Sequence, residues 1–203
     1  MNSPQAPERA RKRMSRAERE KQILAVAERV FANEGYQMTS MDEVAAEVGL
    51  SKPMLYEYFG SKEGLLLACL QRAKRELLES TNLAAAAAEG PEQLLFDCLL
   101  AFFKFSDEHG QAWALLRNEF SIPNASINTE LEAIRVQQRD FTAGLLGNIR
   151  TDLDDQQLEA FAESIIGACE RLAMWREQRP EVTAEKATEH LMSLIAPSLA
   201  AGL

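Results

Sequence analysis

Apolar residues recur at spacings of three and four along nearly the whole chain, without sustained alternation of apolar and polar residues. Because this spacing places apolar side chains on one face of a helix, the sequence predicts an all-α fold of about nine helices. Gly35, Gly49, Gly60, Gly90 and Gly110 fall between the apolar stretches, where they would separate helices. The expected helices span residues 15–35, 40–49, 51–59, 62–84, 92–109, 113–120, 127–149, 155–178 and 183–199, and the alanine tract at 84–88 can extend the fourth.

Two short helices in the N-terminal quarter are separated by a sharp turn. Ser40 and Glu43 have the spacing of a capping box, in which the Ser hydroxyl accepts from the amide three residues on and the Glu carboxylate reaches back. Ser51 can cap the following helix, which tolerates Pro53 in its first turn. With Gly49 between them, the two helices have the arrangement of a helix-turn-helix, and a purely structural helix pair is the alternative.

The second short helix carries hydroxyls, rings and cations where the phosphates and base edges of DNA would lie. Its apolar residues Leu55 and Phe59 are expected to pack inward. Glu57 either points away from phosphate or accepts from a cytosine amino group. The polar and aromatic positions that favour DNA binding are Ser51, Lys52, Pro53, Met54, Tyr56 and Tyr58, followed by Lys62.

Three segments in this region carry a family resemblance: TSMDEVA at 39–45, VGLSKPMLYEYF at 48–59 and SKEGL at 61–65. Over residues 19–70 the chain resembles the tetracycline-repressor (TetR) family of bacterial transcription regulators; the remainder is similar in length, helical pattern and the ending at 175–199. The resemblance implies a homodimer in which each subunit presents one recognition helix to the major groove of a near-palindromic double-stranded DNA operator. It also implies that a small-molecule effector binds in the larger domain.

Carried over position by position, the resemblance assigns residues of the two short helices to DNA contacts. It assigns Lys52, Pro53, Met54 and Tyr58 to the groove-facing surface and Thr39, Ser51, Tyr56 and Lys62 to the DNA backbone. Lys52 is the expected base reader because lysine can donate to guanine O6 and N7.

The charge along the chain is consistent with this assignment. The net charge is −9, but residues 1–75 hold 13 Lys or Arg against 10 Asp or Glu, a balance of +3, and the remainder holds 9 against 21, a balance of −12. The basic residues nearest the N-terminus can contact phosphate or remain a solvated arm: Arg9, Arg11, Lys12, Arg13, Arg16, Arg19 and Lys21. We therefore expect a flexible basic arm over 1–14, the helix-turn-helix domain over 15–62 and an effector-binding and dimerisation domain over 63–203.

Aromatic residues in the larger domain are candidates for lining an effector cavity, although most apolar stripes there are expected to be core. Because few polar residues interrupt these stripes, a mostly apolar or aromatic effector is favoured. The candidate residues are Phe102, Phe105, Trp113, Arg117, Phe120, Phe141 and Cys169.

The predicted helix at 158–175 is apolar on more than one side, so it needs a second partner. Together with the last helix and their symmetry mates it can form a four-helix bundle, as the family resemblance implies; burial on two sides within a monomer is the alternative. Pro197 is expected to kink or end the last helix. The interface candidates are Ile166, Ala173, Met174, Leu191 and Ile195.

Several other functions are not indicated. His109 and His190 stand alone, without the spacing of a metal site, and no phosphate loop or nucleophile motif is present, so we expect no enzyme activity, no metal and no cofactor. The three cysteines lie in apolar stretches, which favours packing over oxidant sensing, and no segment predicts secretion or a membrane span. A cytoplasmic protein is expected. The competing function is a helical dimeric interaction protein without DNA readout.

Overall fold

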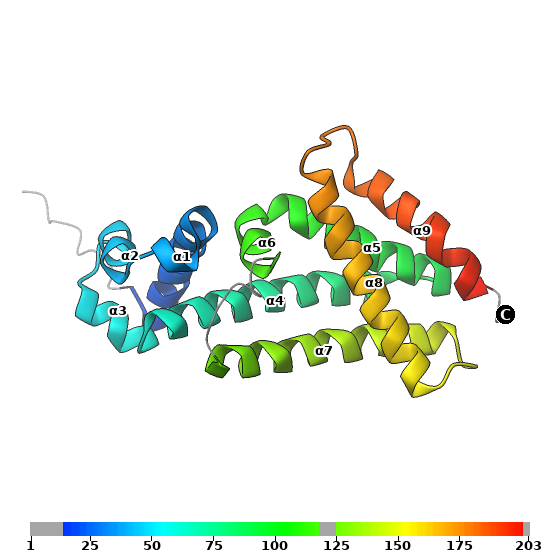
Figure 1. The fold of residues 1–203 in the computed structure, drawn as a ribbon, viewed down its shortest axis with the longest axis horizontal. Helices are drawn as coiled ribbons and strands as arrows, with labels where there is room; N and C mark the ends of the chain where they lie inside the picture. Colours follow the sequence, from blue (N-terminus) through cyan, green and yellow to red (C-terminus); the bar gives the residue numbers. More distant parts are fainter. Residues whose placement is uncertain (1–13, 118–124, 201–203) are drawn as a thin grey trace, which may run out of the picture.

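The computed structural model describes residues 14–117 and 125–200, which form nine helices (Figure 1). This confirms the predicted all-α class. The helices are α1 (Arg16–Met38), α2 (Met41–Val48), α3 (Lys52–Phe59), α4 (Lys62–Ala87), α5 (Pro91–Glu108), α6 (Gly110–Arg117), α7 (Ala125–Ile149), α8 (Asp155–Arg176) and α9 (Ala184–Ala200). Within these described ranges, no helix has the length and apolar character needed to cross a lipid bilayer.

Several helix ends differ from the expected positions, and two of them involve residues that were expected to limit a helix. Helix α6 begins at Gly110, three residues early, because the His109 carbonyl already accepts from the Trp113 amide at 2.9 Å; residues 118–120 lie outside the described residues. Helix α9 continues to Ala200 with Pro197 inside it, so Pro197 does not end the helix. Because proline has no amide hydrogen, the hydrogen bond that position 197 would donate to the Ser193 carbonyl is missing from α9.

The N-terminal domain is built from α1, α2, α3 and the beginning of α4. Gly35 has φ of 76°, which breaks the regular geometry of α1 where the sequence predicts its end. Thr39 secures this break, since its hydroxyl donates to the Gly35 carbonyl at 2.9 Å. Gly49 adopts the left-handed conformation after α2, and its amide donates back to the carbonyls of Ala45 and Ala46. The turn that sets α3 against α2 therefore depends on a glycine.

Helix α4 connects the two domains. In Figure 1 it extends from the N-terminal domain along the length of the larger domain, with α7 beside it. It packs against α1 and α3 at its beginning and against α5, α6 and α7 further along. A displacement of α4 would consequently change packing contacts in both domains.

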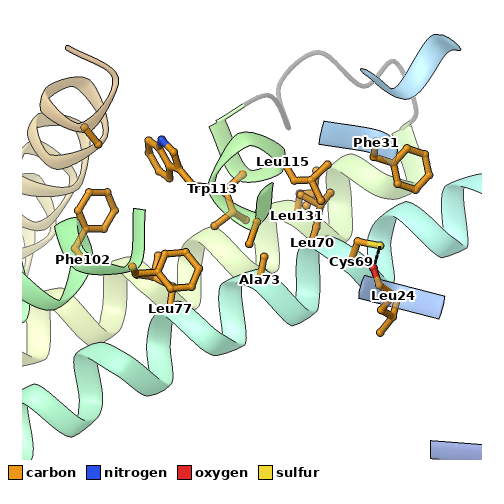
Figure 2. Packing of buried hydrophobic residues seen from close by; sticks show 14 of the residues in the cluster. Leu24, Phe31, Cys69, Leu70, Ala73, Leu77, Phe102, Trp113, Leu115 and Leu131 are labelled. Carbon is orange, nitrogen blue, oxygen red and sulfur yellow. Dashed lines mark hydrogen bonds between the residues drawn. The ribbon is translucent and has the colours of Figure 1, made fainter. Parts of the chain in front are cut away.

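One hydrophobic core continues through this connection. Figure 2 shows Leu24 and Phe31 of α1 near Cys69 and Leu70 of α4, with Leu115 of α6 close by. These five side chains are at most 7% exposed. The core therefore continues from the N-terminal domain into the larger domain, across the boundary predicted at residues 62–63.

Candidate DNA-binding and ligand-binding sites

Helix α3 is held on the N-terminal domain by the buried Leu55, with Tyr58 and Phe59 partly buried against the same core. Leu55 has no exposed surface, whereas Lys52, Met54 and Tyr56 around it are exposed. Ser40 caps α2 by accepting from the Glu43 amide at 3.1 Å, which is the Ser half of the predicted capping box. Helix α3 is thus fixed from beneath while most of its surface faces solvent.

The eight predicted DNA-contacting residues differ in exposure. Seven lie on the outer surface of α3 or at the helix ends beside it, Ser51, Lys52, Pro53, Met54 and Tyr56 being exposed and Tyr58 and Lys62 half-buried. The eighth, Thr39, is 3% exposed because it caps α1. The first seven residues therefore keep solvent-accessible surface on or beside α3, whereas Thr39 is buried.

Several of these side chains already have partners within the subunit. The Lys52 Nζ donates to Asp42 Oδ2 at 2.7 Å, and this carboxylate raises the pKa of Lys52. The guanidinium of Arg16 lies 5.1 Å from the centre of the Tyr58 ring. If Lys52 reads a base edge as predicted, it must first give up its contact with Asp42.

Lys62 supports the domain from the side of α4. Its Nζ donates to the Gln37 carbonyl at 3.4 Å and lies 4.4 Å from the centre of the Tyr36 ring. The hydroxyl of Tyr36 in turn donates to Glu63 at 2.6 Å, and burial with this bond raises the pKa of Tyr36 to about 12. The beginning of α4 is thereby attached to the end of α1.

A cavity of approximately 420 Å³ lies between α4, α5, α7 and α8. This volume is within the range of small-molecule sites. Three predicted effector residues, Phe102, Phe141 and Cys169, line this cavity, and most of the remaining lining is leucine and isoleucine. The four helices come from widely separated parts of the chain.

The other predicted effector residues lie elsewhere. Phe105 is 2% exposed and stacks on His109 at 4.8 Å between ring centres. Trp113 and Arg117 line a second depression, of about 630 Å³, where both contact Glu177. Phe120 lies outside the described residues. The spacing of aromatic residues therefore identified part of the cavity but also marked core and ion-pair positions.

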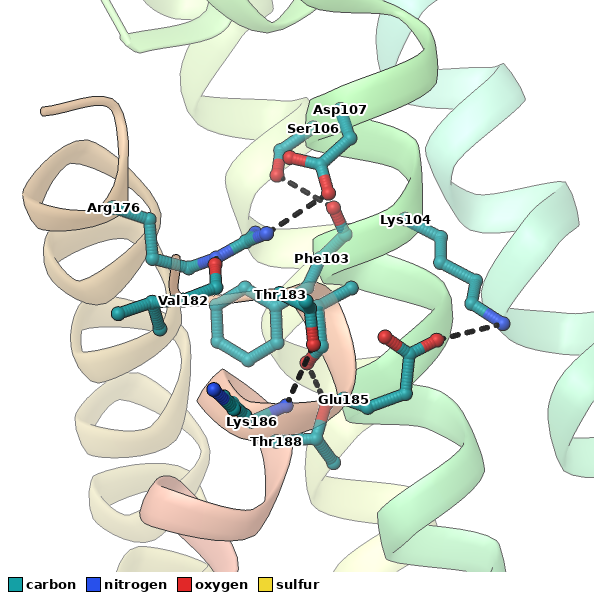
Figure 3. Close-up of polar contacts among 11 residues, drawn as sticks. Phe103, Lys104, Ser106, Asp107, Arg176, Val182, Thr183, Glu185, Lys186 and Thr188 are labelled. Atoms are coloured by element: carbon teal, nitrogen blue, oxygen red, sulfur yellow. Dashed lines mark hydrogen bonds and ion pairs between the residues drawn. The ribbon is translucent and has the colours of Figure 1, made fainter. Parts of the chain in front are cut away.

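The second depression is lined by ion pairs made within the subunit (Figure 3). Arg176 donates to Asp107 at 2.9 Å and to the Val182 carbonyl at 3.0 Å, which ties the loop before α9 to α5. Lys104 lies 3.4 Å from Glu185. Because three ion pairs, Lys104–Glu185, Arg117–Glu177 and Arg176–Asp107, already occupy this depression, it is less suited to a ligand than the first cavity.

The two domains match known families. The model of the bacterial regulatory proteins of the tetR family matches residues 23–69, and that of the tetracyclin repressor-like C-terminal domain matches residues 91–197. The chain belongs to the TetR family. Its N-terminal domain is that of the bacterial regulatory proteins of this family, and the helix-turn-helix prediction is confirmed.

Individual TetR-family relatives agree with this assignment. The HTH-type transcriptional activator FasR of Mycolicibacterium smegmatis is 37% identical over 113 residues, so the match spans 56% of this chain and about half, 52%, of FasR. A TetR-like regulator from Rhodococcus sp. RHA1 is 33% identical, with a TM-score of 0.75 over 93% of this chain and 99% of that chain. The fold is shared with AibR, solved in complex with isovaleryl coenzyme A and operator DNA, at 20% identity and a TM-score of 0.74 over 87% of this chain and 97% of AibR.

The residues predicted for the TetR-family dimer interface are only partly at the surface. Ala173 and Leu191 are 3% and 4% exposed inside the subunit, and Ile166 lines the cavity. Met174 and Ile195 are half-buried. The buried residues of α8, Ala162, Ile165, Cys169, Ala173 and Arg176, share one face of the helix, so the predicted interface positions on this face offer little area to a partner.

A different stripe of α8 faces outward. Phe161 and Trp175 are 39% and 37% exposed, and the half-buried Ala168 lies between them at intervals of seven residues. On α9, Leu194 is 72% exposed. The seven-residue spacing in the sequence could have identified this stripe, because residues seven apart lie on the same side of a helix.

The sequence reasoning also missed the polar residues of the cavity. Gln71, Lys74 and Arg75 of α4 and Gln138 of α7 line it together with the apolar side chains. They are spaced at three and four residues on α4, opposite the residues that face α1. This spacing of three and four residues could have indicated the polar positions of the cavity. From the sequence alone, however, a polar stripe that faces α7 looks the same as a stripe that faces solvent.

A charged cluster occupies the joint between α1 and α4. Glu28 is 7% exposed, its Oε1 lies 3.6 Å from Arg72 Nε, and burial raises its pKa to about 7 despite this guanidinium. Arg72 donates to Glu76 at 2.8 Å, and Glu76 is 3.9 Å from His109 Nδ1. The joint between the domains therefore contains a poorly solvated carboxyl group.

The cysteines are suited to packing. Burial raises the pKa of Cys69, Cys98 and Cys169, that of Cys98 to about 11. A thiol with a raised pKa is largely protonated at neutral pH and reacts slowly with oxidants. This favours the predicted packing role.

Proposed function

We propose that this TetR-family regulator acts in the cytoplasm as a homodimeric repressor that leaves a near-palindromic operator when a small, mostly apolar effector binds. The observation that carries this proposal is that one helix, α4, begins beside the recognition helix α3 and also lines the cavity. DNA binding and effector binding would thus share a structural element.

The connection from α4 to α3 is tight. A Cβ atom on Gly64 would lie 2.1 Å from the Phe59 carbonyl oxygen, which shows how closely the end of α3 approaches the beginning of α4. Glu63 and Lys62 also hold Tyr36 and Gln37 at the end of α1. We expect a shift of α4 to carry α3 with it and to change the distance between the two recognition helices of a dimer.

An effector can favour release only through different affinities for the two states of the protein. It must bind the free dimer more tightly than the DNA-bound dimer. Equal affinity of the effector for both states would contradict this part of the proposal.

We propose that the dimer forms through α8 and α9. Phe161, Trp175 and Leu194 supply exposed apolar area, and the half-buried Met174 and Ile195 lie on the same two helices. A twofold axis across these helices would make an isologous four-helix contact. The recognition helices would then be spaced about one turn of DNA apart, near 34–36 Å.

Activation of transcription is the second candidate. FasR, 37% identical over its matched part, is named a transcriptional activator. The same DNA-binding surface serves both functions, since the position of the operator relative to the promoter decides between them.

The test begins with selection of bound duplexes from a random DNA pool by the full chain. We expect an inverted repeat to be enriched and a scrambled duplex to bind at least ~10³-fold more weakly. Reporter transcription with and without the regulator then separates repression from activation. Failure to enrich any duplex, with the dimer intact, would favour a helical interaction protein without DNA readout.

The variant Lys52→Ala tests the base-reading assignment. We expect loss of discrimination at one base pair of each half-site, by about 1–3 kcal/mol, because one direct contact to a base edge is removed. Lys62→Ala is expected to weaken all sequences alike, and Lys104→Ala in the larger domain is the control. An unchanged operator preference for Lys52→Ala would contradict the assignment.

A further inference from the structure

An ion pair joins the two helices of the helix-turn-helix close to their N-terminal ends. Lys52 is the first residue of α3 and Asp42 is the second residue of α2, and Lys52 Nζ donates to Asp42 Oδ2 at 2.7 Å. The side chains are 46% and 70% exposed, respectively. Figure 1 shows α2 and α3 at the end of the molecule opposite α9. The ion pair is therefore open to solvent beside the surface predicted to meet DNA.

Two other carboxylates of this domain have partners that are not predicted to contact DNA. Glu47, also on α2, pairs with Arg29 of α1. Glu63, at the beginning of α4, accepts from the hydroxyl of Tyr36. Asp42 differs from both because its partner is the predicted base reader.

A carboxylate at this position needs a new hydrogen-bond donor when DNA binds. If Lys52 turns to a base edge, Asp42 loses the cation that neutralised it. The phosphates of DNA are negatively charged acceptors, so they would repel the carboxylate. In the major groove, the donors are the amino groups of cytosine and adenine. An amino group on a base is therefore the partner that DNA can offer to Asp42.

A G·C base pair offers partners to both side chains. Guanine presents the acceptors O6 and N7 to a lysine, and cytosine presents its N4 amino group to a carboxylate. Guanine O6 and cytosine N4 lie about 3 Å apart, because a Watson–Crick hydrogen bond joins them. This distance is close to the 2.7 Å between Lys52 Nζ and Asp42 Oδ2. The two side chains can thus reach the two halves of one base pair with small movements.

We infer that Asp42 is a second base reader, which accepts from the N4 amino group of the cytosine paired with the guanine that Lys52 reads. This rests on the proposed function, because it takes Lys52 as the reader of guanine. The ion pair of the free protein is exchanged for two contacts across one base pair. A residue of α2 thereby joins the base-reading residues of α3.

Two structural roles of Asp42 lead to different expectations. A negative charge in the first turn stabilises α2 through the helix dipole, and loss of this effect would lower stability without changing base preference. A carboxylate that only restrains Lys52 would weaken the binding of every DNA sequence alike. Base reading instead changes the preference at one base pair, so the three roles can be separated.

The first test replaces single atoms of the operator selected from the random pool. The base pair is the one at which Lys52→Ala loses discrimination, and the full chain is titrated with each modified duplex. N4-methylcytosine replaces the amino hydrogen that faces the major groove. We expect it to weaken binding of the unchanged protein at least about 5-fold, and to have little effect on Asp42→Ala.

The complementary probe is 7-deazaguanine in the same base pair, which removes the N7 acceptor. It should weaken the unchanged protein and Asp42→Ala, since both keep Lys52. It should have little effect on Lys52→Ala. The two modified bases therefore assign one side chain to each half of the base pair.

The second test compares variants of α2. Asp42→Ala should lower the preference for the operator over a duplex with A·T at this position at least about 5-fold. Its affinity for a scrambled duplex should stay the same or rise, because a negative charge facing phosphates is removed. Asp42→Asn keeps an acceptor oxygen and should retain part of the preference. Glu47→Ala, the matched control, removes a paired carboxylate of the same helix and should leave base preference unchanged.

Urea unfolding of Asp42→Ala confirms that the variant is folded. Two results would overturn the inference: equal sensitivity of Asp42→Ala and the unchanged protein to N4-methylcytosine, or tighter binding of Asp42→Ala to operator and scrambled duplex by the same factor. If Lys52→Ala loses discrimination but Asp42→Ala does not, the inference alone fails. If Lys52→Ala keeps its operator preference, the base-reading assignment in the proposed function fails together with the inference.

Discussion

The two domains of the chain differ in how completely their interiors are filled. Beneath the recognition helix, Ile23, Ala27, Val44 and Leu55 have no exposed surface. The larger domain leaves approximately 420 Å³ between four helices. Atoms that line such a space lose dispersion contacts, which lowers stability. The comparison shows that the domain with the DNA-binding surface has a closely packed core, whereas the domain proposed to bind an effector contains unfilled space.

The largest expected effect is a difference in the free energy of unfolding between two leucine variants, one in each domain. Leu55→Ala should lower the free energy of unfolding by about 2–5 kcal/mol, because it creates a cavity in a filled core. Leu145→Ala should cost about 1 kcal/mol or less, since the half-buried Leu145 already borders empty space. Urea unfolding of both variants, followed by circular dichroism, measures the difference.

Both variants must unfold in a single transition with the slope of the unchanged protein for this comparison to hold. Similar losses for Leu55→Ala and Leu145→Ala would contradict the distinction between a filled and an unfilled interior. Addition of a bound ligand should raise the stability of the unchanged protein more than that of Leu145→Ala.

The charged cluster around Glu28, where α1 packs against α4, gives the second prediction. Burial raises the pKa of Glu28 from its ordinary value of 4.5 to about 7, so between pH 4.5 and 7 the folded chain binds more protons than the unfolded chain. The free energy of unfolding therefore contains a contribution that falls as pH rises through this window. Its full size is about 3 kcal/mol, reached above pH 7.

Glu28→Gln should remove this contribution. We expect the variant to be more stable than the unchanged protein by about 1–3 kcal/mol at pH 8 and close to it at pH 4.5. The matched control is Glu79→Gln, an exposed carboxylate on α4, which should leave the pH dependence unchanged. Parallel stability curves for Glu28→Gln and the unchanged protein between pH 4.5 and 8 would show that Glu28 is ionised in the folded chain throughout.

The features predicted correctly from sequence depend on residues close together in the chain. Ser40 and Glu43, the turn at Gly49 and the inward-facing Leu55 lie within 16 residues, and each was placed by local stereochemistry. The helix-turn-helix could therefore be identified before any tertiary contact was known. The family pattern did not reveal a further contact of Thr39, whose hydroxyl caps α1 by donating to the Gly35 carbonyl.

The larger domain was predicted less well because its sites are assembled from distant segments. The cavity joins Lys74 to Gln138 and Phe141 to Cys169, and no local pattern states which faces of α4, α7 and α8 meet. Aromatic residues were favoured as ligand contacts, yet Phe105 packs on His109 and Trp113 contacts Glu177. The helical spacing alone could not separate core, cavity and partner surfaces.

The smallest expected effect on stability is the difference between variants of Ser40 and Ser51, which are the N-cap residues of α2 and α3. Ser40 caps α2 through its hydroxyl, whereas the Ser51 side chain makes no capping hydrogen bond to α3. Ser40→Ala should lower the free energy of unfolding by about 1 kcal/mol, and Ser51→Ala by no more than a few tenths. For DNA affinity we expect the opposite order, in which Ser51→Ala weakens operator binding more than Ser40→Ala does. Ser51 lies at the N-terminus of α3, where we propose that it contacts a DNA phosphate. Denaturation and operator titration of the two variants measure both orders, and a Ser51→Ala variant that loses stability without losing affinity would assign Ser51 to capping rather than to DNA.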